Sequence, residues 1–229
     1  MSSAAGRLIV FEGPEGGGKS LQATRLDASL RDDGFDVLLT REPGGTPLGE
    51  DIRTLLLRRD GYTLQPTVEA LLMSAARAQH VADVLRPALT AGTLVVCDRF
   101  IDSTYAYQGG GSGLSITSLQ ALQGFATGGL EPDLRILLDV PVEIGLARRW
   151  AEQDSVNRID AADVEFHQRV RQTFLDLAEA SPERWVVVDA RQPLDVVTQA
   201  VRQAVARIVQ RPSQGLRKEE ATTPPDRWS

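Results

Sequence analysis

Short, nearly unbroken apolar runs recur along the chain, with much longer segments between them. Unbroken hydrophobicity over four to eight residues is typical of parallel strands that are buried on both faces of a sheet. Because parallel neighbours need crossover connections, the pattern predicts one parallel sheet with right-handed crossovers. The expected strands are Leu8–Phe11, Val37–Thr40, Thr93–Cys97, Asp133–Val140 and Trp185–Asp189.

The segments between these runs carry apolar residues at helical spacing. Gly34 follows the first of them as a C-cap would, and Gly128 and Gly129 follow the fourth. This alternation predicts an α/β fold of three layers, in which helices flank a five-stranded parallel sheet. The expected helices are Leu21–Asp33, Leu48–Arg59, Pro66–Ala91 and Ser115–Ala126, with further helical sequence between the fourth and fifth strands.

Two further stretches lie between these elements, and the first of them is expected to be an irregular loop. Arg41–Pro47 contains two prolines and two glycines and directly follows a strand, where α/β sheets bind ligands. Ile101–Gln108 is polar and aromatic, and it leads into Gly109–Gly113, for which we predict a flexible loop.

The stretch Gly13–Ser20 has the spacing G-x-x-x-x-G-K-[ST] of a Walker A loop, between the first strand and the first helix. A glycine-rich turn exposes backbone N–H groups to phosphate, Lys19 can reach the outer phosphates, and Ser20 can offer its hydroxyl to a magnesium ion. Among the 25 basic residues only Lys19 and Lys218 are lysines. A solvated glycine turn, the simpler alternative, would need neither Lys19 nor Ser20.

Length and composition favour one folded domain. The 229 residues, 42% hydrophobic and 24% charged, suffice for one sizeable core. We expect a single domain over residues 1–210. Residues 211–229 contain almost no apolar side chain before Trp228, so they predict a disordered tail.

Charge and the apolar pattern exclude several classes of protein. A net charge of −6 argues against broad binding to nucleic acid or to membranes. Residues 1–7 contain no apolar signal core, and no segment approaches the roughly 18 uninterrupted apolar residues of a membrane helix. We therefore expect a cytoplasmic protein. The lone Cys97 is interpreted as a small buried residue rather than a nucleophile.

Four blocks of residues resemble the thymidylate kinase family, whose members transfer the γ-phosphate of ATP to deoxythymidine monophosphate (dTMP). The first block specifies only a P-loop protein, whereas the second and fourth are specific at these spacings. The resemblance extends from about Leu8 to Ile208 and implies a P-loop kinase fold with a small mobile lid at about residues 142–166. The blocks are Phe11–Ser20, Thr40–Pro47 with Glu50–Arg53 behind it, Ala75–His80, and Asp98–Phe100 through Gln108–Gly109.

On the donor side, the resemblance implies a site for ATP and Mg²⁺. Ser20 and Asp98 would hold the metal, and Lys19, Asp98 and Arg99 would be catalytic, because positive charge must meet the phosphoryl group as it moves. A structural ion pair with Arg99 is the alternative for Asp98. The implied ATP-binding residues are Gly13, Pro14, Glu15, Gly16, Gly17, Gly18, Lys19, Ser20 and Leu21.

For the sugar and phosphate of dTMP, the resemblance assigns four residues. Glu15 would accept a hydrogen bond from the 3′-hydroxyl, which accounts for a carboxylate inside a phosphate loop. Arg53 and Arg99 would hold the acceptor phosphate. Tyr107 would crowd the 2′ position and favour a deoxyribose, although a lone tyrosine is more often a core residue.

For the base, the resemblance implies that Arg77 donates to a carbonyl oxygen of thymine and that Thr104 and Gln108 line the same pocket. A solvated or ion-paired side chain is the alternative for Arg77. Met73 stands where many relatives have a phenylalanine that stacks on thymine. We therefore expect dTMP binding at Met73 with a weaker or more tolerant base platform.

The phosphate loop has no basic residue beside Glu15, so the resemblance implies that the lid supplies the extra catalytic arginine. Arg158 is the first choice. Arg148 and Arg149 are the alternatives, and both can equally be exposed residues of a helix.

ATP and dTMP are the expected partners, and the resemblance implies a homodimer. Two other functions stay open: another nucleotide or deoxynucleoside kinase of the same fold, and a P-loop switch ATPase that binds nucleotide to change its affinity for a partner. A nucleotide-binding module without chemistry is disfavoured, because Lys19, Ser20, Asp98 and Arg99 are all present.

Overall fold

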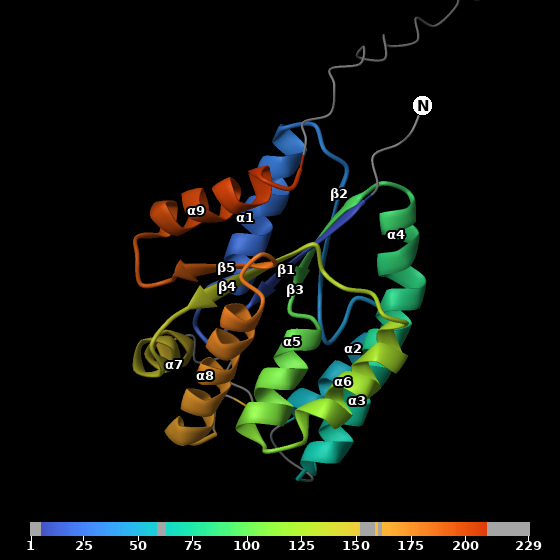
Figure 1. The fold of residues 1–229 in the computed structure, drawn as a ribbon, viewed down its shortest axis with the longest axis vertical. Coiled ribbons are helices and arrows are strands. Elements are labelled where there is room, and N and C mark those ends of the chain that lie inside the picture. Colours follow the sequence, from blue (N-terminus) through green and yellow to red (C-terminus); the bar gives the residue numbers. More distant parts are fainter. Residues whose placement is uncertain (1–5, 59–62, 152–158, 160–161, 210–229) are drawn as a thin grey trace, which may run out of the picture.

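The computed structural model describes residues 6–58, 63–151, 159 and 162–209. Its centre is a parallel sheet in the order β2-β3-β1-β4-β5, as Figure 1 shows. Since every pairing is parallel, the carboxyl ends of all the strands lie along one edge. The strands are β1 (Arg7–Glu12), β2 (Val37–Arg41), β3 (Leu94–Asp98), β4 (Leu134–Asp139) and β5 (Trp185–Asp189), which confirms the predicted sheet.

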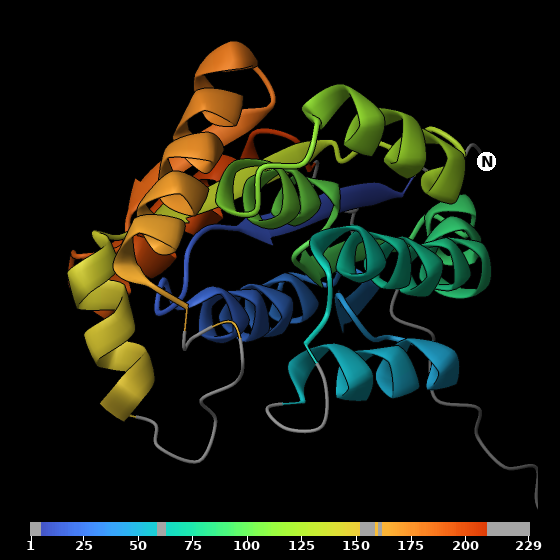
Figure 2. The ribbon, with the colours of Figure 1, turned by 90° about the horizontal axis from the view of Figure 1, so that it is seen from below.

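Helices cover both faces of the sheet, as the alternating pattern predicts (Figures 1 and 2). The helices α1 and α9 lie on one face, and α3 to α6 and α8 lie on the other. The described elements are α1 (Lys19–Asp32), α2 (Pro47–Leu57), α3 (Pro66–His80), the π-helical η1 (Val81–Leu85), α4 (Arg86–Thr90), α5 (Ile101–Thr104), the π-helical η2 (Tyr105–Gly111), α6 (Ile116–Thr127), α7 (Val142–Ala151), α8 (Val164–Ala180) and α9 (Leu194–Ala206).

Strand β1 contributes side chains to a hydrophobic core on each face of the sheet. Its alternate side chains face opposite ways, so Ile9 and Phe11 pack with α1 and α9, whereas Leu8 and Val10 pack with η1 and α6. All four are fully buried. The phosphate loop that follows β1 is consequently anchored at the centre of the molecule.

The prediction of a flexible loop at Gly109–Gly113 is wrong for Gly109–Gly111, which belong to η2. These glycines allow close packing between helices. A Cβ on Gly109 would lie 2.4 Å from Ile116 Cδ1 of α6, and one on Gly110 would lie 1.9 Å from Thr173 Oγ1 of α8. Glycine here serves packing rather than flexibility, which sequence alone does not distinguish.

The other boundaries differ only slightly from the prediction. Helix α2 begins at Pro47, which was placed in the preceding loop, because proline fits the first helical position. The predicted helix Pro66–Ala91 is one helical run made of α3, η1 and α4. Ser115 caps α6 by accepting a bond from the Ser118 N–H.

The predicted lid at about residues 142–166 includes α7 and the beginning of α8, and residues 152–158 and 160–161 within it lie outside the described residues. Its mobility stays a prediction. The predicted tail, residues 211–229, also lies outside the described part. Within that part, no helix has both the length and the apolar character needed to cross a bilayer.

Candidate active site

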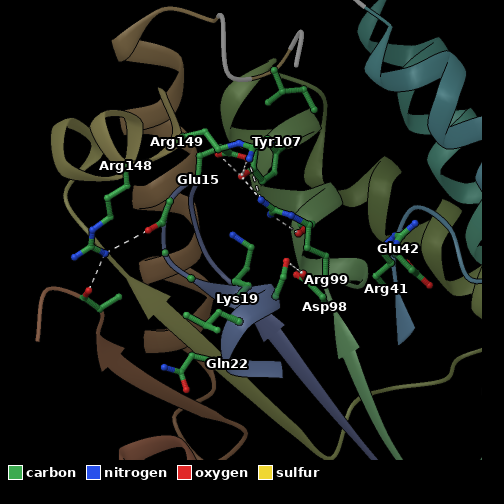
Figure 3. A pocket seen from close by; sticks show the side chains of 18 of the residues that line it. Glu15, Lys19, Gln22, Arg41, Glu42, Asp98, Arg99, Tyr107, Arg148 and Arg149 are labelled. Atoms are coloured by element: carbon green, nitrogen blue, oxygen red, sulfur yellow. Dashed lines mark hydrogen bonds and ion pairs between the residues drawn. The ribbon is translucent and has the colours of Figure 1, made fainter. Parts of the chain in front are cut away.

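A cleft of about 960 Å³ opens along the carboxyl edge of the sheet. The segments that follow β1, β2, β3 and β5 reach it together with α2, α3, η2 and α7. Figure 3 shows Glu15, Lys19, Asp98 and Arg99 converging at its centre. The cleft is at the upper end of the range of small-ligand sites.

The phosphate loop presents unused backbone donors to this cleft. Helix α1 begins at Lys19, and its N-cap, Gly18, has the left-handed φ of 83° that glycine adopts readily. No side chain caps this helix and no acidic residue lies in its first turn. The helix N-terminus therefore keeps its N–H groups and partial positive charge available for an anion.

Lys19 is only 7% exposed, and it links the end of the phosphate loop to its first two residues. Its ammonium donates to the carbonyls of Gly13 at 3.0 Å and Pro14 at 2.7 Å. Burial, with the nearby Arg99 charge acting in the same direction, lowers the pKa of Lys19 to about 8.

Helix α7 packs directly against the backbone of the phosphate loop. A Cβ on Gly16 would lie 2.0 Å from the Gly145 carbonyl oxygen, and one on Gly145 would lie 2.3 Å from the Glu15 carbonyl oxygen. This contact brings Arg148 to the loop, where its Nη1 donates to the carbonyls of Gly16 at 3.3 Å and Ala190 at 2.9 Å (Figure 3).

Ser20 and Asp98 form the candidate metal pair. Ser20 Oγ donates to Asp98 Oδ2 at 2.5 Å, whereas Asp98 Oδ1 is buried with no hydrogen-bond partner in the part of the chain that the structure describes. That part contains no cluster of three or more His, Cys, Asp or Glu side chains able to hold a metal. One carboxylate and one hydroxyl beside a phosphate site fit Mg²⁺, which usually keeps phosphate and water ligands.

Arg99 has a strained backbone conformation, and its guanidinium contacts the phosphate loop and η2. Its φ of 72° lies in the left-handed region, which is uncommon for residues other than glycine and recurs at functional sites. Nη1 donates to Gly13 O at 3.2 Å, and Nη2 donates to Glu15 Oε1 at 2.9 Å and to Tyr107 Oη at 3.0 Å. Burial disfavours the charge, but the facing Tyr107 and Glu15 raise the pKa of Arg99.

Glu15 points away from the phosphate loop toward this cluster. The Tyr107 hydroxyl donates to its carboxylate, 2.7 and 2.6 Å from the two oxygens, and His167 Nδ1 lies 3.7 Å from Oε2. Burial opposes ionisation, but Arg99, His167, Lys19 and Tyr107 together lower the pKa of Glu15 to about 2. Glu15 is therefore held as an ionised carboxylate at the centre of the cleft.

Glu12 is a supporting residue that sequence reasoning missed. Its buried carboxylate accepts from the N–H groups of Phe100 at 2.9 Å and Ser103 at 3.2 Å and from the Ser103 hydroxyl at 2.5 Å. These bonds fix the turn that carries Arg99 and the beginning of α5. Burial, with the Asp102 charge, raises the pKa of Glu12 to about 7. Its position as a charged residue at the carboxyl end of the central strand β1 was the available signal.

The far end of the cleft contains several residues predicted to bind the acceptor. Arg53 on α2 donates to the Pro43 carbonyl at 3.0 Å, and Met73 and Gln108 line the cleft with it. The structure adds Glu69, one turn before Met73 on α3, which sequence reasoning did not select.

Arg77 and Thr104 do not line the cleft. Arg77 is 1% exposed, and its guanidinium donates to Glu42 Oε2 at 2.6 Å, Thr104 Oγ1 at 2.9 Å, Gln123 Oε1 at 2.5 Å and the Phe100 carbonyl at 2.9 Å. The buried carboxylate of Glu42 attracts this charge into the wall behind the cleft. Direct contact of Arg77 or Thr104 with a base stays a prediction.

Arg158, the predicted lid arginine, lies outside the described residues. Arg148 and Arg149, its alternatives on α7, both line the cleft. The assignment of the extra arginine stays a prediction.

The arrangement of a phosphate loop, a carboxylate with a hydroxyl and a buried arginine cluster agrees with comparisons to known proteins. The sequence profile of the thymidylate kinase family matches residues 11–201. The chain belongs to the thymidylate kinase family. Its members are phosphotransferases of the nucleoside monophosphate kinase class, which confirms the predicted enzyme class.

Individual thymidylate kinases support this membership over most of the chain. That of Thermomicrobium roseum is 54% identical over 203 residues, which cover 89% of this chain and 96% of the relative. That of Pseudomonas putida strain W619 is 49% identical over 203 residues, covering 89% and 98%. The crystal structure of the Ehrlichia chaffeensis thymidylate kinase superposes with a TM-score of 0.71 at 32% identity, covering 88% of this chain and 99% of that one.

Proposed function

We propose that this chain, as a thymidylate kinase, uses ATP to phosphorylate dTMP to dTDP in the cleft described above. The observation that carries the proposal is the placement of the Glu15, Arg99 and Tyr107 cluster beside Lys19, Ser20 and Asp98. Lys19, Ser20 and Asp98 suit the triphosphate of ATP. The Glu15, Arg99 and Tyr107 cluster suits a sugar phosphate. A single cleft that holds both can bring two polyanions in line, which is the main requirement of phosphoryl transfer.

At the donor end, the amides of the phosphate loop would bind the phosphates of ATP. Lys19 supplies a buried charge at the base of this loop, and approaching phosphate oxygens would replace its present carbonyl partners. Ser20 and Asp98 would hold Mg²⁺, which, when bound, shields the charge of the outer phosphates. The buried unpaired Asp98 Oδ1 supports this assignment.

At the acceptor end, Arg99 and Arg53 would bind the 5′-phosphate of dTMP, and Glu15 would accept from the 3′-hydroxyl. An ionised Glu15 is suited to this role because it can only accept hydrogen bonds. The Tyr107 ring would lie against the 2′ carbon. Met73, Thr104 and Gln108 would line the base pocket, and Arg77, which also donates to Thr104, would donate to a carbonyl oxygen of thymine.

In the transfer step, an oxygen of the acceptor 5′-phosphate attacks the γ-phosphorus of ATP. A new P–O bond forms as the bond between the γ-phosphorus and the β,γ-bridging oxygen breaks, and ADP leaves with that electron pair. Lys19 and Arg99 would stabilise the charge that spreads over the equatorial oxygens. An arginine from residues 142–166, with Arg158 as the first choice, would complete this stabilisation.

The proposal includes a homodimer in the cytoplasm. Its support is the exposed apolar surface on two neighbouring helices, where Phe125 of α6 is 88% exposed and Leu71 of α3 is 52% exposed. Sedimentation velocity at micromolar protein should give the mass of two chains, and a monomer at every concentration would contradict this part.

The test of the function is a series of acceptors assayed by ADP release with saturating ATP and Mg²⁺. The highest kcat/KM should be for dTMP, with less for dUMP, dCMP, dGMP and thymidine. A higher value for another acceptor would instead support a different kinase of this fold. ADP release that no acceptor stimulates, combined with nucleotide-dependent partner binding, would instead support a switch ATPase.

A further inference from the structure

The base end of the cleft contains a buried, hydrogen-bonded pair of side chains, and one of the two has no role in the function proposed above. Glu69 on α3 and Gln108 on η2 both line the cleft, and they are 8% and 2% exposed. Gln108 Nε2 donates to Glu69 Oε1 at 3.3 Å. The pair therefore joins two elements that are far apart in the sequence.

This bond determines which way the Gln108 amide faces. In this contact a carboxyl oxygen of Glu69 is the acceptor, so its partner is the NH₂ group of the amide. The opposite orientation would place two acceptor oxygens against each other. Gln108 must then direct Oε1 away from Glu69.

Gln108 Oε1 is left as an acceptor without a donor. It is buried, and no described residue donates a hydrogen bond to it. An unsatisfied buried acceptor costs about 1–3 kcal/mol, and a ligand that supplies an N–H or O–H group would recover that cost. The structure therefore contains an acceptor in the wall of the base pocket that is oriented by its neighbour.

Met73 and Arg77 are the other residues near this end that bear on base recognition. Met73 provides an apolar surface, and Arg77 already donates to Glu42, Thr104 and Gln123. The Gln108 amide is therefore a group in the lining of the cleft whose orientation can distinguish bases that differ in donors and acceptors.

We propose that Glu69 is a positioning residue that sets base specificity by holding Gln108 as a hydrogen-bond acceptor. The pair selects a pyrimidine with an N–H at ring position 3, as in thymine and uracil. Cytosine and 5-methylcytosine carry a lone pair at that position, which would face the lone pairs of Gln108 Oε1. This inference rests on the proposed function, since it specifies how the acceptor base is recognised.

The test replaces Glu69 with glutamine, which has nearly the same shape but can accept or donate. In Glu69→Gln the Gln108 amide can rotate and present NH₂ to the ligand. The kcat/KM for dTMP divided by that for 5-methyl-dCMP should fall by about tenfold or more, which is ~1.4 kcal/mol of discrimination. The fall should come mainly from a lower KM for 5-methyl-dCMP, since the 5-methyl group and the sugar phosphate are unchanged.

Two further variants separate positioning from structural damage. Glu179→Gln on the exposed side of α8 removes the same charge away from the cleft and should leave the ratio unchanged. In a Gln108→Leu background, Glu69→Gln should have no further effect on the ratio, because the group it positions is gone. If Glu69→Gln does not fold, Gln108→Leu by itself must still lower the ratio.

An unchanged ratio in folded Glu69→Gln would overturn the proposal, as would an equal effect of that substitution with and without Gln108. The wild-type protein in the same assay keeps the two proposals apart. Wild-type protein that does not phosphorylate dTMP contradicts the function, whereas an active wild type with an unaffected Glu69→Gln ratio contradicts only the role of Glu69.

Discussion

Tyr107 combines two functions that substitution can separate. Its hydroxyl donates to Glu15, at 2.7 and 2.6 Å from the two carboxylate oxygens, and accepts from Arg99 at 3.0 Å. Its ring packs against Phe166 and Phe174, with ring centroids 6.3 and 6.1 Å away. Tyr107→Phe removes only the hydroxyl, and Tyr107→Ala removes both.

The stability changes follow from these contacts. A hydrogen bond to a charged group contributes about 1.5–3 kcal/mol, and Arg99 remains to pair with Glu15, so Tyr107→Phe should cost about 2 kcal/mol. That corresponds to a fall in Tm of roughly 4–8 °C for a protein of this size. Tyr107→Ala also leaves a cavity between two aromatic rings and should cost about 3–5 kcal/mol in total.

The effect on selectivity should differ between the two variants. If the ring excludes a 2′-hydroxyl, Tyr107→Phe keeps the preference for dTMP over its ribonucleotide. Tyr107→Ala should relax that preference by about tenfold or more, which is ~1.4 kcal/mol. The assay is kcat/KM for both acceptors at saturating ATP, with unfolding monitored in parallel.

Tyr105→Phe is the matched control, because Tyr105 lies in the same helical segment but packs in the core away from Glu15. It should change neither selectivity nor the acceptor KM. An unchanged preference in Tyr107→Ala would refute the role of the ring. Equal relaxation in Tyr107→Phe and Tyr107→Ala would move that role to the hydroxyl.

Two other substitutions probe the loop and its support. Lys19→Ala should lower kcat by roughly 10²–10³-fold with a smaller change in the KM for dTMP, because its charge is needed most as the phosphoryl group moves; steady-state kinetics with near-normal kcat would contradict this. Glu12 has a pKa raised from 4.5 to about 7, so between these pH values the folded protein binds more protons at Glu12 than the unfolded chain does. The free energy of unfolding should therefore fall by up to ~3 kcal/mol as the pH rises across that window. Urea unfolding from pH 5 to 8 should show this slope in the wild type but not in Glu12→Gln, and equal slopes would remove Glu12 as its source.

The strands, most helices and the phosphate loop could be predicted because their signals are local. A buried strand such as Val37–Thr40 and a loop such as Gly13–Ser20 are defined by neighbouring residues. Gly109–Gly111 were misjudged because their reason for being glycine lies on other helices, where Ile116 and Thr173 approach closely.

The sequence by itself determined the α/β architecture and the phosphate loop, and its four blocks carried the resemblance to the thymidylate kinase family, to which the chain belongs. Only the tertiary structure decided how the polar side chains pair. Glu15 with Tyr107, Glu12 with Ser103 and Glu69 with Gln108 are separated by 92, 91 and 39 positions. Charge and hydrogen-bond direction act through space over a few ångströms. For this reason no local pattern could reveal that Arg77 is engaged behind the cleft or that Gln108 faces the cleft as an acceptor.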